Sequence, residues 1–151
     1  MRVIIQRVSQ ASVVADGQQA GQIGKGLFVL LGICPTDTTD DIAYLTAKIA
    51  SMRVFSDSAG LMNLSASDVG ADILVVSQFT LFAKTRKGNR PSFIDAARPE
   101  VAIPLYEAFV SELSHITGRH VPTGVFGADM QISLVADGPV SIIMDSKQKD
   151  F

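Results

Sequence analysis

The sequence predicts an α+β fold in which residues 1–151 form a single domain. Two observations support this prediction. Many short apolar runs, rich in β-branched residues and bounded by turn signals, are typical of strands. Two longer segments instead repeat their apolar residues at helical spacing. The chain has 151 residues, which is enough for one domain with a substantial core.

The expected strands are distributed along the whole chain. Leu27–Ile33 is apolar throughout, as expected of a central strand that is covered on both faces. Asp16-Gly17 is a hairpin-type turn signal between two of the runs. The full set of strand-like runs is Val3–Val8, Ala11–Ala15, Gln19–Ile23, Leu27–Ile33, Arg53–Phe55, Met62–Leu64, Ile73–Val76, Val121–Phe126, Met130–Val135 and Val140–Met144.

Two helices are expected. The first begins within Thr36–Asp41, where a capping residue precedes acidic side chains, and the second spans Pro99–Thr117. Gly118 is the expected C-cap of the second helix. Pro104 removes a backbone hydrogen bond, so it predicts a bend or a late start there. The apolar stripes are Ile42, Leu45, Ile49 and Met52 in the first helix, and Leu105, Phe109, Leu113 and Ile116 in the second.

The composition favours a protein of the reducing cytosol that associates with another subunit. Hydrophobic residues make up 47% of the chain and the mean hydropathy is +0.29, yet no apolar run approaches the roughly 20 residues needed to span a bilayer. The extra apolar surface is therefore expected in the core and against a partner. Met1-Arg2 leads directly into a strand pattern, without the layout of a signal peptide. Cys34 is the only cysteine, so no intrachain disulfide is possible.

The residues that usually hold metals are scarce. His115 and His120 are the only histidines, their spacing does not match a helical metal pair, and no cysteine or carboxylate cluster flanks them. Neither a metal site, another cofactor nor a Ser-His-Asp triad is expected. The net charge of −2 gives no global attraction for nucleic acid. Residues 146–151 are expected to form a frayed tail.

A polar segment follows the apolar run Ile73–Val76. Ser77, Gln78 and Thr80 surround Phe79 at the end of this expected core strand. These side chains could simply satisfy the backbone where the strand ends. They could also form a site, because a rigid strand can aim the groups that follow it.

A basic segment comes next in the chain. It carries Lys84, Arg86, Lys87 and Arg90, together with a glycine and an asparagine. Such a segment is usually an exposed, solvated loop. Beside a site, it could instead contact phosphates.

Two motifs together resemble those of the D-aminoacyl-tRNA deacylase family, also called D-tyrosyl-tRNA(Tyr) deacylases. They are Ser77-Gln78-Phe79-Thr80-Leu81 and Asp137-Gly138-Pro139-Val140, and the resemblance covers nearly the whole chain. The chain departs from the family pattern at Ala136, where asparagine is usual, and at Ser141, where threonine is usual. Further matching segments are Ile5-Gln6-Arg7-Val8, Ala11-Ser12-Val13, Gly24-Lys25-Gly26-Leu27, Arg53-Val54-Phe55-Ser56-Asp57, Met62-Asn63-Leu64, Arg90-Pro91-Ser92-Phe93 and Ala128-Asp129-Met130.

The resemblance implies a fold, an assembly and a substrate. The strands would form two packed, barrel-like sheets with the helices outside, and two chains would form a homodimer with its active sites at the interface. The substrate would be the 3′ end of an aminoacyl-tRNA that carries a D-amino acid. Hydrolysis of its ester would release the amino acid, and glycyl-tRNA would also be accepted.

The resemblance also implies roles for residues. Ser77, Gln78, Phe79 and Thr80 would form the catalytic segment, in which main-chain groups of Phe79 and Thr80 contact the oxyanion. Gly138 and Pro139 would adopt a cis peptide and reach into the partner's pocket, where they reject L side chains. Arg7 would hold this Gly-Pro loop and Met130 would contact the substrate. Lys84, Arg86, Lys87 and Arg90 would contact the tRNA.

Two other functions are alternatives to this interpretation. Thr80 or Ser77 could act as a covalent nucleophile, although neither has a neighbouring base in the sequence. Alternatively, the chain could be a non-catalytic RNA-binding module. Such a module needs a dominant basic face or stacking aromatics. The isoelectric point of about 5.6 and the aromatic content of 7% argue against it.

Overall fold

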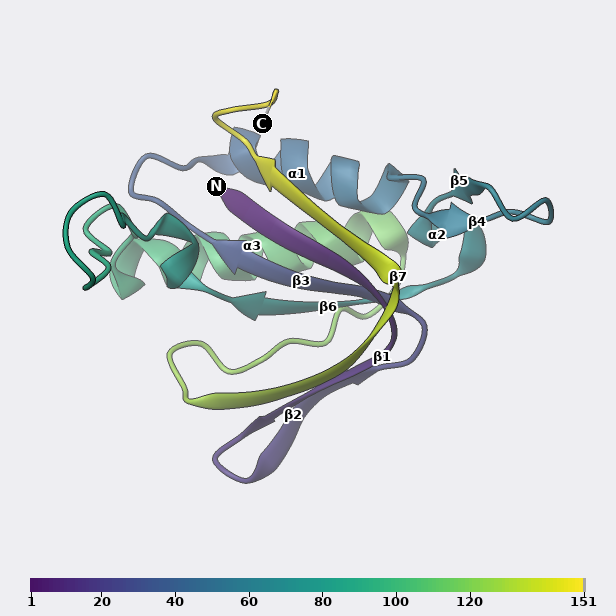
Figure 1. Cartoon of the computed structure of the whole chain (residues 1–151), viewed down its shortest axis with the longest axis horizontal. Coiled ribbons are helices and arrows are strands. Elements are labelled where there is room, and N and C mark those ends of the chain that lie inside the picture. Colours follow the sequence, from purple (N-terminus) through teal and green to yellow (C-terminus); the bar gives the residue numbers. More distant parts are fainter. Residues whose placement is uncertain (151) are drawn as a thin grey trace.

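The computed structural model describes residues 1–150 and confirms the α+β class. Strands, two long helices and two shorter helical segments alternate along the chain (Figure 1). In chain order the elements are β1 (Arg2–Ala15), β2 (Gln18–Ile23), β3 (Gly26–Gly32), α1 (Thr39–Ser51), β4 (Phe55–Ser56), β5 (Met62–Leu64), α2 (Ala66–Val69), β6 (Asp72–Ser77), the 3₁₀-helix η1 (Phe79–Phe82), α3 (Pro99–Thr117) and β7 (Met130–Asp145).

The main sheet is built on β1. This strand pairs antiparallel with β2, β3 and β7, and β3 pairs in parallel with β6. The resulting five-stranded sheet curls on itself, so that β2 and the first half of β7 lie below the rest (Figure 1). The two packed sheets implied by the family resemblance are thus two halves of one continuous, curled sheet. The short strands β4 and β5 form a separate hairpin.

Long-range pairing merges strands that the sequence predicts as separate. Val3–Val8 and Ala11–Ala15 form the single strand β1, and the last two predicted runs form the single strand β7. Register irregularities between Gln6 and Gln10 accompany the bend that both strands share. The predicted strand Val121–Phe126 is wrong, since only Thr123 forms an isolated bridge, to Val75 of β6.

The curled sheet separates two apolar clusters. The larger one lies between the sheet and helices α1 and α3, and it includes Ile5, Leu31, Val75 and Phe109. The smaller one lies inside the curl, around residues such as Phe28. Successive residues of β3 and β6 point alternately into the two clusters, which explains why the runs Leu27–Leu31 and Ile73–Val76 are continuously apolar.

The helices begin and end where local chemistry allows. Thr38 and Asp41 form a capping box at the start of α1. The N-cap, Thr38, lies within the segment Thr36–Asp41 in which the helix was predicted to begin. Helix α3 spans Pro99–Thr117 as predicted, and Gly118 ends it with a positive φ of 64°. Of the two alternatives predicted at Pro104, a bend or a late start, the late start is wrong, because α3 already begins at Pro99. Within residues 1–150, neither helix is long and apolar enough to cross a membrane.

Ser146 and Lys147, predicted to belong to a frayed tail, are both bound to the rest of the chain. The Ser146 amide donates to the Met1 carbonyl over 2.9 Å, and the Lys147 ammonium lies 2.7 Å from a carboxylate oxygen of Asp41. The predicted fraying is therefore wrong for these two residues, and Phe151 lies outside the described residues. Burial alone would raise the pKa of Asp41. Hydrogen bonds from Lys147, Ser146 and the Thr38 backbone outweigh that effect and hold this pKa well below its usual value.

Replacing Asp41 by Asn is expected to lower the free energy of unfolding at neutral pH. Because the folded-state pKa of Asp41 is depressed, its contribution is complete above the unfolded pKa of about 3.9 and is lost as the pH falls further. The deficit of Asp41→Asn relative to the unaltered chain should thus shrink below about pH 4. Urea unfolding at pH 7, 5 and 3 measures this, with Asp40→Asn as the control in the same helical turn. A deficit that is equal at pH 7 and pH 3 would contradict the assignment.

Candidate active site

The polar segment after β6 is folded against the end of β3. Ser77 is paired in register with Leu31, and the next amide, of Gln78, donates to the Leu31 carbonyl over 2.8 Å. The chain then turns into η1. A Cβ atom added at Gly32 would lie 3.0 Å from Leu81 Cβ and 3.1 Å from the Gln78 carbonyl oxygen. Glycine at this position therefore permits η1 to pack directly on β3.

Arg2 holds η1 from the other side. Its Nη1 donates to the Leu81 carbonyl over 2.7 Å, and its guanidinium carbon lies 4.9 Å from the centroid of the Phe82 ring. Nε and Nη2 also donate to Oδ2 of Asp145, over 3.0 and 2.8 Å. Burial raises the pKa of Asp145, but hydrogen bonds from the Lys147 backbone and Arg2 bring it below its usual value. Arg2 thus connects the end of β7 to η1.

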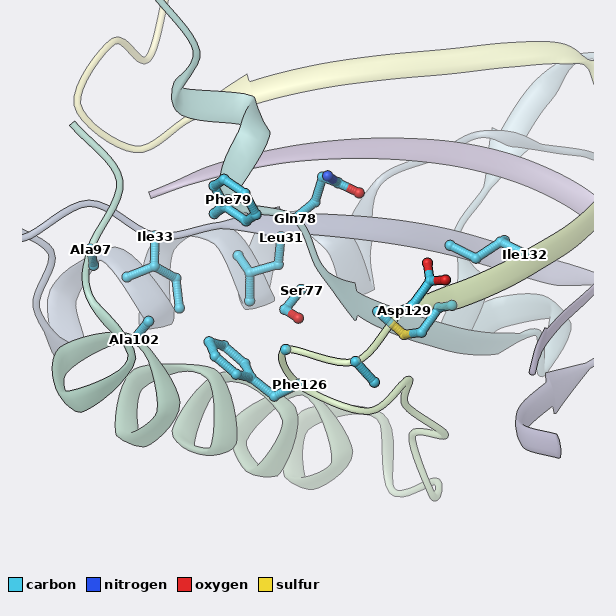
Figure 2. A pocket seen from close by; sticks show the side chains of 13 residues that line it. Leu31, Ile33, Ser77, Gln78, Phe79, Ala97, Ala102, Phe126, Asp129 and Ile132 are labelled. Atoms are coloured by element: carbon cyan, nitrogen blue, oxygen red, sulfur yellow. The ribbon is translucent and has the colours of Figure 1, made fainter. Parts of the chain in front are cut away.

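A pocket of about 300 Å³ opens beside this segment. Ser77 lies between Leu31 and Phe126, while Asp129 lies on the side toward β7 (Figure 2). Among the lining residues within the described chain, Asp129 has the only ionisable side chain. The complete lining consists of Leu31, Ile33, Ser77, Gln78, Phe79, Ala97, Ala102, Phe126, Gly127, Ala128, Asp129, Met130 and Ile132. The pocket is therefore largely apolar, with Ser77 and Gln78 on the β6 side and Asp129 on the β7 side.

Thr80 lies next to this pocket without lining it. Its hydroxyl oxygen accepts a hydrogen bond from the Gln78 side-chain amide over 2.5 Å. His115 and His120 line a different hollow, between α3 and residues 120–126. The histidines therefore do not provide a base for a nucleophilic Thr80 or Ser77. Within residues 1–150, no group of three His, Cys, Asp or Glu side chains could hold a metal ion.

Phe126 lines the pocket and is held there by Tyr106, and neither residue is marked as a site residue by the sequence. Tyr106 of α3 donates its hydroxyl to the Val75 carbonyl over 2.9 Å, and its ring packs edge-to-face on Phe126 with centroids 5.8 Å apart. Burial raises the pKa of Tyr106 to about 12, despite a lowering hydrogen bond with Thr123, so its hydroxyl remains a donor at neutral pH. No local pattern marks Phe126 as a pocket residue, because α3 and β6 position it.

The position of Met130 in the pocket wall depends on its close contact with Gly124. A Cβ atom added at Gly124 would lie 2.6 Å from the Met130 sulfur, too close for any real contact. Gly124 is in turn held by its amide, which donates to the Val75 carbonyl over 3.2 Å. The absence of a side chain at Gly124 therefore leaves room for Met130 in the pocket wall.

The Gly138-Pro139 segment lies elsewhere in the same chain. Its peptide bond is cis, as the resemblance implied. Arg7 donates from Nε to the Asp137 carbonyl over 3.1 Å and from Nη1 to the Val54 carbonyl over 2.5 Å. Arg7 pairs with Leu27, whereas Ser77 at the pocket pairs with Leu31. Leu27 and Leu31 are four residues apart on β3. The Gly-Pro segment and the pocket are therefore separated by about 13 Å along the sheet, at roughly 3.3 Å per residue.

The basic residues lie on an exposed hairpin that follows η1. Lys84 and Ser92 close its base with two backbone hydrogen bonds of 2.7 and 3.0 Å. Lys84 forms an ion pair with Asp95, with 2.6 Å between Nζ and Oδ2. Arg86, Lys87 and Arg90 are exposed, and within residues 1–150 none of them forms a salt bridge.

Comparison with known proteins identifies the family. The profile described as D-Tyr-tRNA(Tyr) deacylase matches residues 4–145. The chain belongs to this deacylase family. A protein of Flavobacterium johnsoniae named D-aminoacyl-tRNA deacylase is 58% identical over 150 residues, which cover 99% of this chain and 100% of that protein. Proteins of the same name from Akkermansia muciniphila and Chromobacterium violaceum are 57% and 55% identical, again covering 99% of this chain and 100% of each relative.

Two solved structures share the fold of this chain. One, described as c-Myc DNA Unwinding Element Binding Protein, superposes with a TM-score of 0.89 at 39% identity, covering 96% of this chain and 98% of that one. Another, described as a probable eukaryotic D-amino acid tRNA deacylase, has a TM-score of 0.84 at 16% identity, covering 95% and 97%. The second likeness concerns the fold alone. Membership of the family implied by the two sequence motifs is confirmed.

Replacing Arg2 by Lys is expected to loosen η1 in this deacylase. Lysine retains the positive charge near Asp145 but lacks the planar, multidentate donor group that reaches both Asp145 and Leu81. The Leu81 and Ala83 amides, which donate to Gln78 and Thr80, should exchange with solvent at least several-fold faster. Hydrogen exchange followed by NMR measures this. Arg119→Lys, which alters the Arg119–Asp72 ion pair elsewhere, is the matched control. Unchanged exchange at both amides would contradict the role given to Arg2.

Proposed function

We propose that this deacylase hydrolyses the ester of D-aminoacyl-tRNA and releases the D-amino acid and the tRNA. The observation that carries the proposal is the pocket beside Ser77–Thr80, found in a chain whose full-length relatives at 52–58% identity are named D-aminoacyl-tRNA deacylases. The pocket of about 300 Å³ is in the size range of small-molecule sites. It therefore suits the aminoacylated terminal nucleotide rather than a larger part of the tRNA. This function requires the compartment where aminoacyl-tRNA is used, the cytoplasm.

Backbone groups are the proposed catalytic elements. The first amides of a helix have no acceptor within that helix, and in η1 these are the amides of Phe79 and Thr80. Donors that are already fixed in place stabilise the oxyanion formed when water attacks the ester carbonyl. An aminoacyl ester is an activated bond, so positioned water and these donors are sufficient. The 2′-hydroxyl of the terminal adenosine is proposed to assist the water.

The proposed selectivity for D-amino acids requires a second copy of the chain. Gly138 and Pro139 lie about 13 Å along the sheet from the level of Ser77, so they do not reach the pocket of their own chain. In a homodimer, the partner's Gly138-Pro139 would supply carbonyl oxygens to the substrate ammonium and would clash with an L side chain. Exposed apolar residues on β7, namely Ile132, Val135 and Ile143, offer surface for such an interface.

Two further features of specificity follow from this proposal. Glycine has no side chain for the Gly138-Pro139 segment to reject, so glycyl-tRNA should also be a substrate. Lys84, Arg86, Lys87 and Arg90 are proposed to contact phosphates of the tRNA, because their hairpin follows η1 directly and is exposed. Arg7 is proposed to hold the Gly-Pro segment through the Asp137 carbonyl.

The purified chain is expected to cleave D-aminoacyl-tRNA and to spare the L-enantiomer. Rejection by steric clash gives a large difference in rate, at least about a hundredfold, because the L side chain meets rigid backbone. The measurement is loss of labelled amino acid from matched D- and L-tyrosyl-tRNA at one enzyme concentration. Equal rates on both enantiomers would refute the proposed function.

Replacing Thr80 by Val is expected to reduce kcat by no more than about tenfold. Valine keeps the branched shape but removes the hydroxyl, and backbone donors survive such a change. A modest loss is expected because the Gln78 amide loses its acceptor. Single-turnover kinetics on D-tyrosyl-tRNA test this, with Ser77→Ala measured in parallel. If activity vanished while circular dichroism showed a folded protein, Thr80 would be a nucleophile, since removing a nucleophile can cost about a millionfold.

A further inference from the structure

Two exposed phenylalanine rings, those of Phe79 and Phe93, pack on each other beside the pocket. Phe79 is 57% exposed and Phe93 is 37% exposed. Their centroids lie 5.1 Å apart and their planes meet at 79°, an edge-to-face arrangement. This packing fixes both rings while leaving aromatic surface in contact with solvent. Because Phe79 also lines the pocket, the exposed pair adjoins the place where a substrate would leave it.

The same two rings border the basic hairpin. Phe93 directly follows Ser92, which closes the hairpin with Lys84, and Phe79 lies on η1 just before it. The loop of this hairpin carries Arg86, Lys87 and Arg90, whose charges are not neutralised by acidic residues within 1–150. The chain as a whole has a net charge of −2, so this positive charge is local. Aromatic surface and local positive charge therefore occur together.

This combination selects one class of occupant. A peptide or a second copy of the chain that binds through apolar surface would not use the three cations, and one that binds through acidic side chains would not use the exposed aromatic rings. Single-stranded nucleic acid supplies both complements, since its bases stack on aromatic rings and its phosphates contact Lys and Arg. The 3′ end of tRNA is unpaired, so its bases are free to stack.

We infer that Phe79 and Phe93 form a stacking platform for the nucleobase that precedes the aminoacylated adenosine. Arg86, Lys87 and Arg90 hold the phosphates of the same strand. This inference rests on the proposed function, because that function places the terminal adenosine in the pocket. It adds to that function a second binding site for RNA, which a free aminoacyl-adenosine would not occupy.

The test compares a long and a short substrate with the Phe93→Leu variant. Leucine keeps apolar volume but removes the aromatic face, and stacking on one aromatic ring accounts for roughly a tenfold or larger effect on affinity. The KM for D-tyrosyl-tRNA should rise about tenfold, whereas kcat/KM for D-tyrosyl-adenosine, which lacks the preceding nucleotide, should not change. Ile94→Ala is the control, because Ile94 is the adjacent apolar residue and is 78% exposed.

A second readout does not depend on catalysis. Uncharged tRNA with 2-aminopurine immediately before the terminal adenosine should lose fluorescence on binding the unaltered chain, as the base stacks. It should lose much less on binding Phe93→Leu. An unchanged KM for tRNA, an equal loss on both substrates, or equal quenching by both proteins would overturn the platform. If the unaltered chain failed to cleave D-tyrosyl-tRNA, the proposed function would be refuted. The fluorescence assay would still show whether the base stacks on Phe79 and Phe93.

Discussion

The backbone pairing of β1 determines where the two parts of the proposed site, η1 and the Gly138-Pro139 segment, lie. Because β1 bonds to β3 along one edge and to β7 along the other, its register fixes Arg2 opposite Gly32 and Asp145, and Arg7 opposite Leu27. Arg2 then contacts η1, while Arg7 contacts the segment before Gly138. The same strand therefore positions the proposed catalytic segment and the proposed chiral selector. It also keeps them about 13 Å apart along the sheet.

Three independent contacts hold η1, as the proposed catalysis by its backbone amides requires. The Gln78 amide bonds to Leu31, Gly32 admits Leu81 at close range, and Arg2 binds the Leu81 carbonyl. Catalysis by main-chain donors requires that they be oriented before the substrate binds, because reorienting dipoles during the reaction would raise the barrier. A short 3₁₀-helix alone would not provide this rigidity. The sheet and Arg2 provide it. The side chains of the segment add local contacts, such as the hydrogen bond from the Gln78 amide to the Thr80 hydroxyl.

Local signals in the sequence were sufficient for some elements but not for the pocket. Helix α3 could be predicted to the residue because Pro99 and Gly118 mark its ends. Strand β3 could be predicted to within one residue at each end, because its apolar run is continuous. The polar segment after β6 and its family were also predictable from motifs. The pocket walls were not, because Ala97, Ala102 and Phe126 come together only through tertiary packing. The predicted breaks in β1 and β7 were wrong for the same reason: pairing between distant strands extends them through local turn signals.

In the proposed function the pocket of one chain is completed by Gly138-Pro139 of another chain, and dimers that combine two different variants can test this arrangement. Ala97→Phe would fill the pocket. Gly138→Ala would disturb the selector, since its φ is +127° and a Cβ would lie 3.0 Å from the Val140 amide and 3.1 Å from Arg7 Nη2. Each variant alone should be defective. Co-expressed with different affinity tags, the two should form mixed dimers in which one site of two is intact. Random assortment makes about half of all dimers mixed, so the unseparated protein should have about a quarter of normal D-selective activity and purified mixed dimers about half. Purified mixed dimers with no activity beyond that of the parent variants would contradict the shared site.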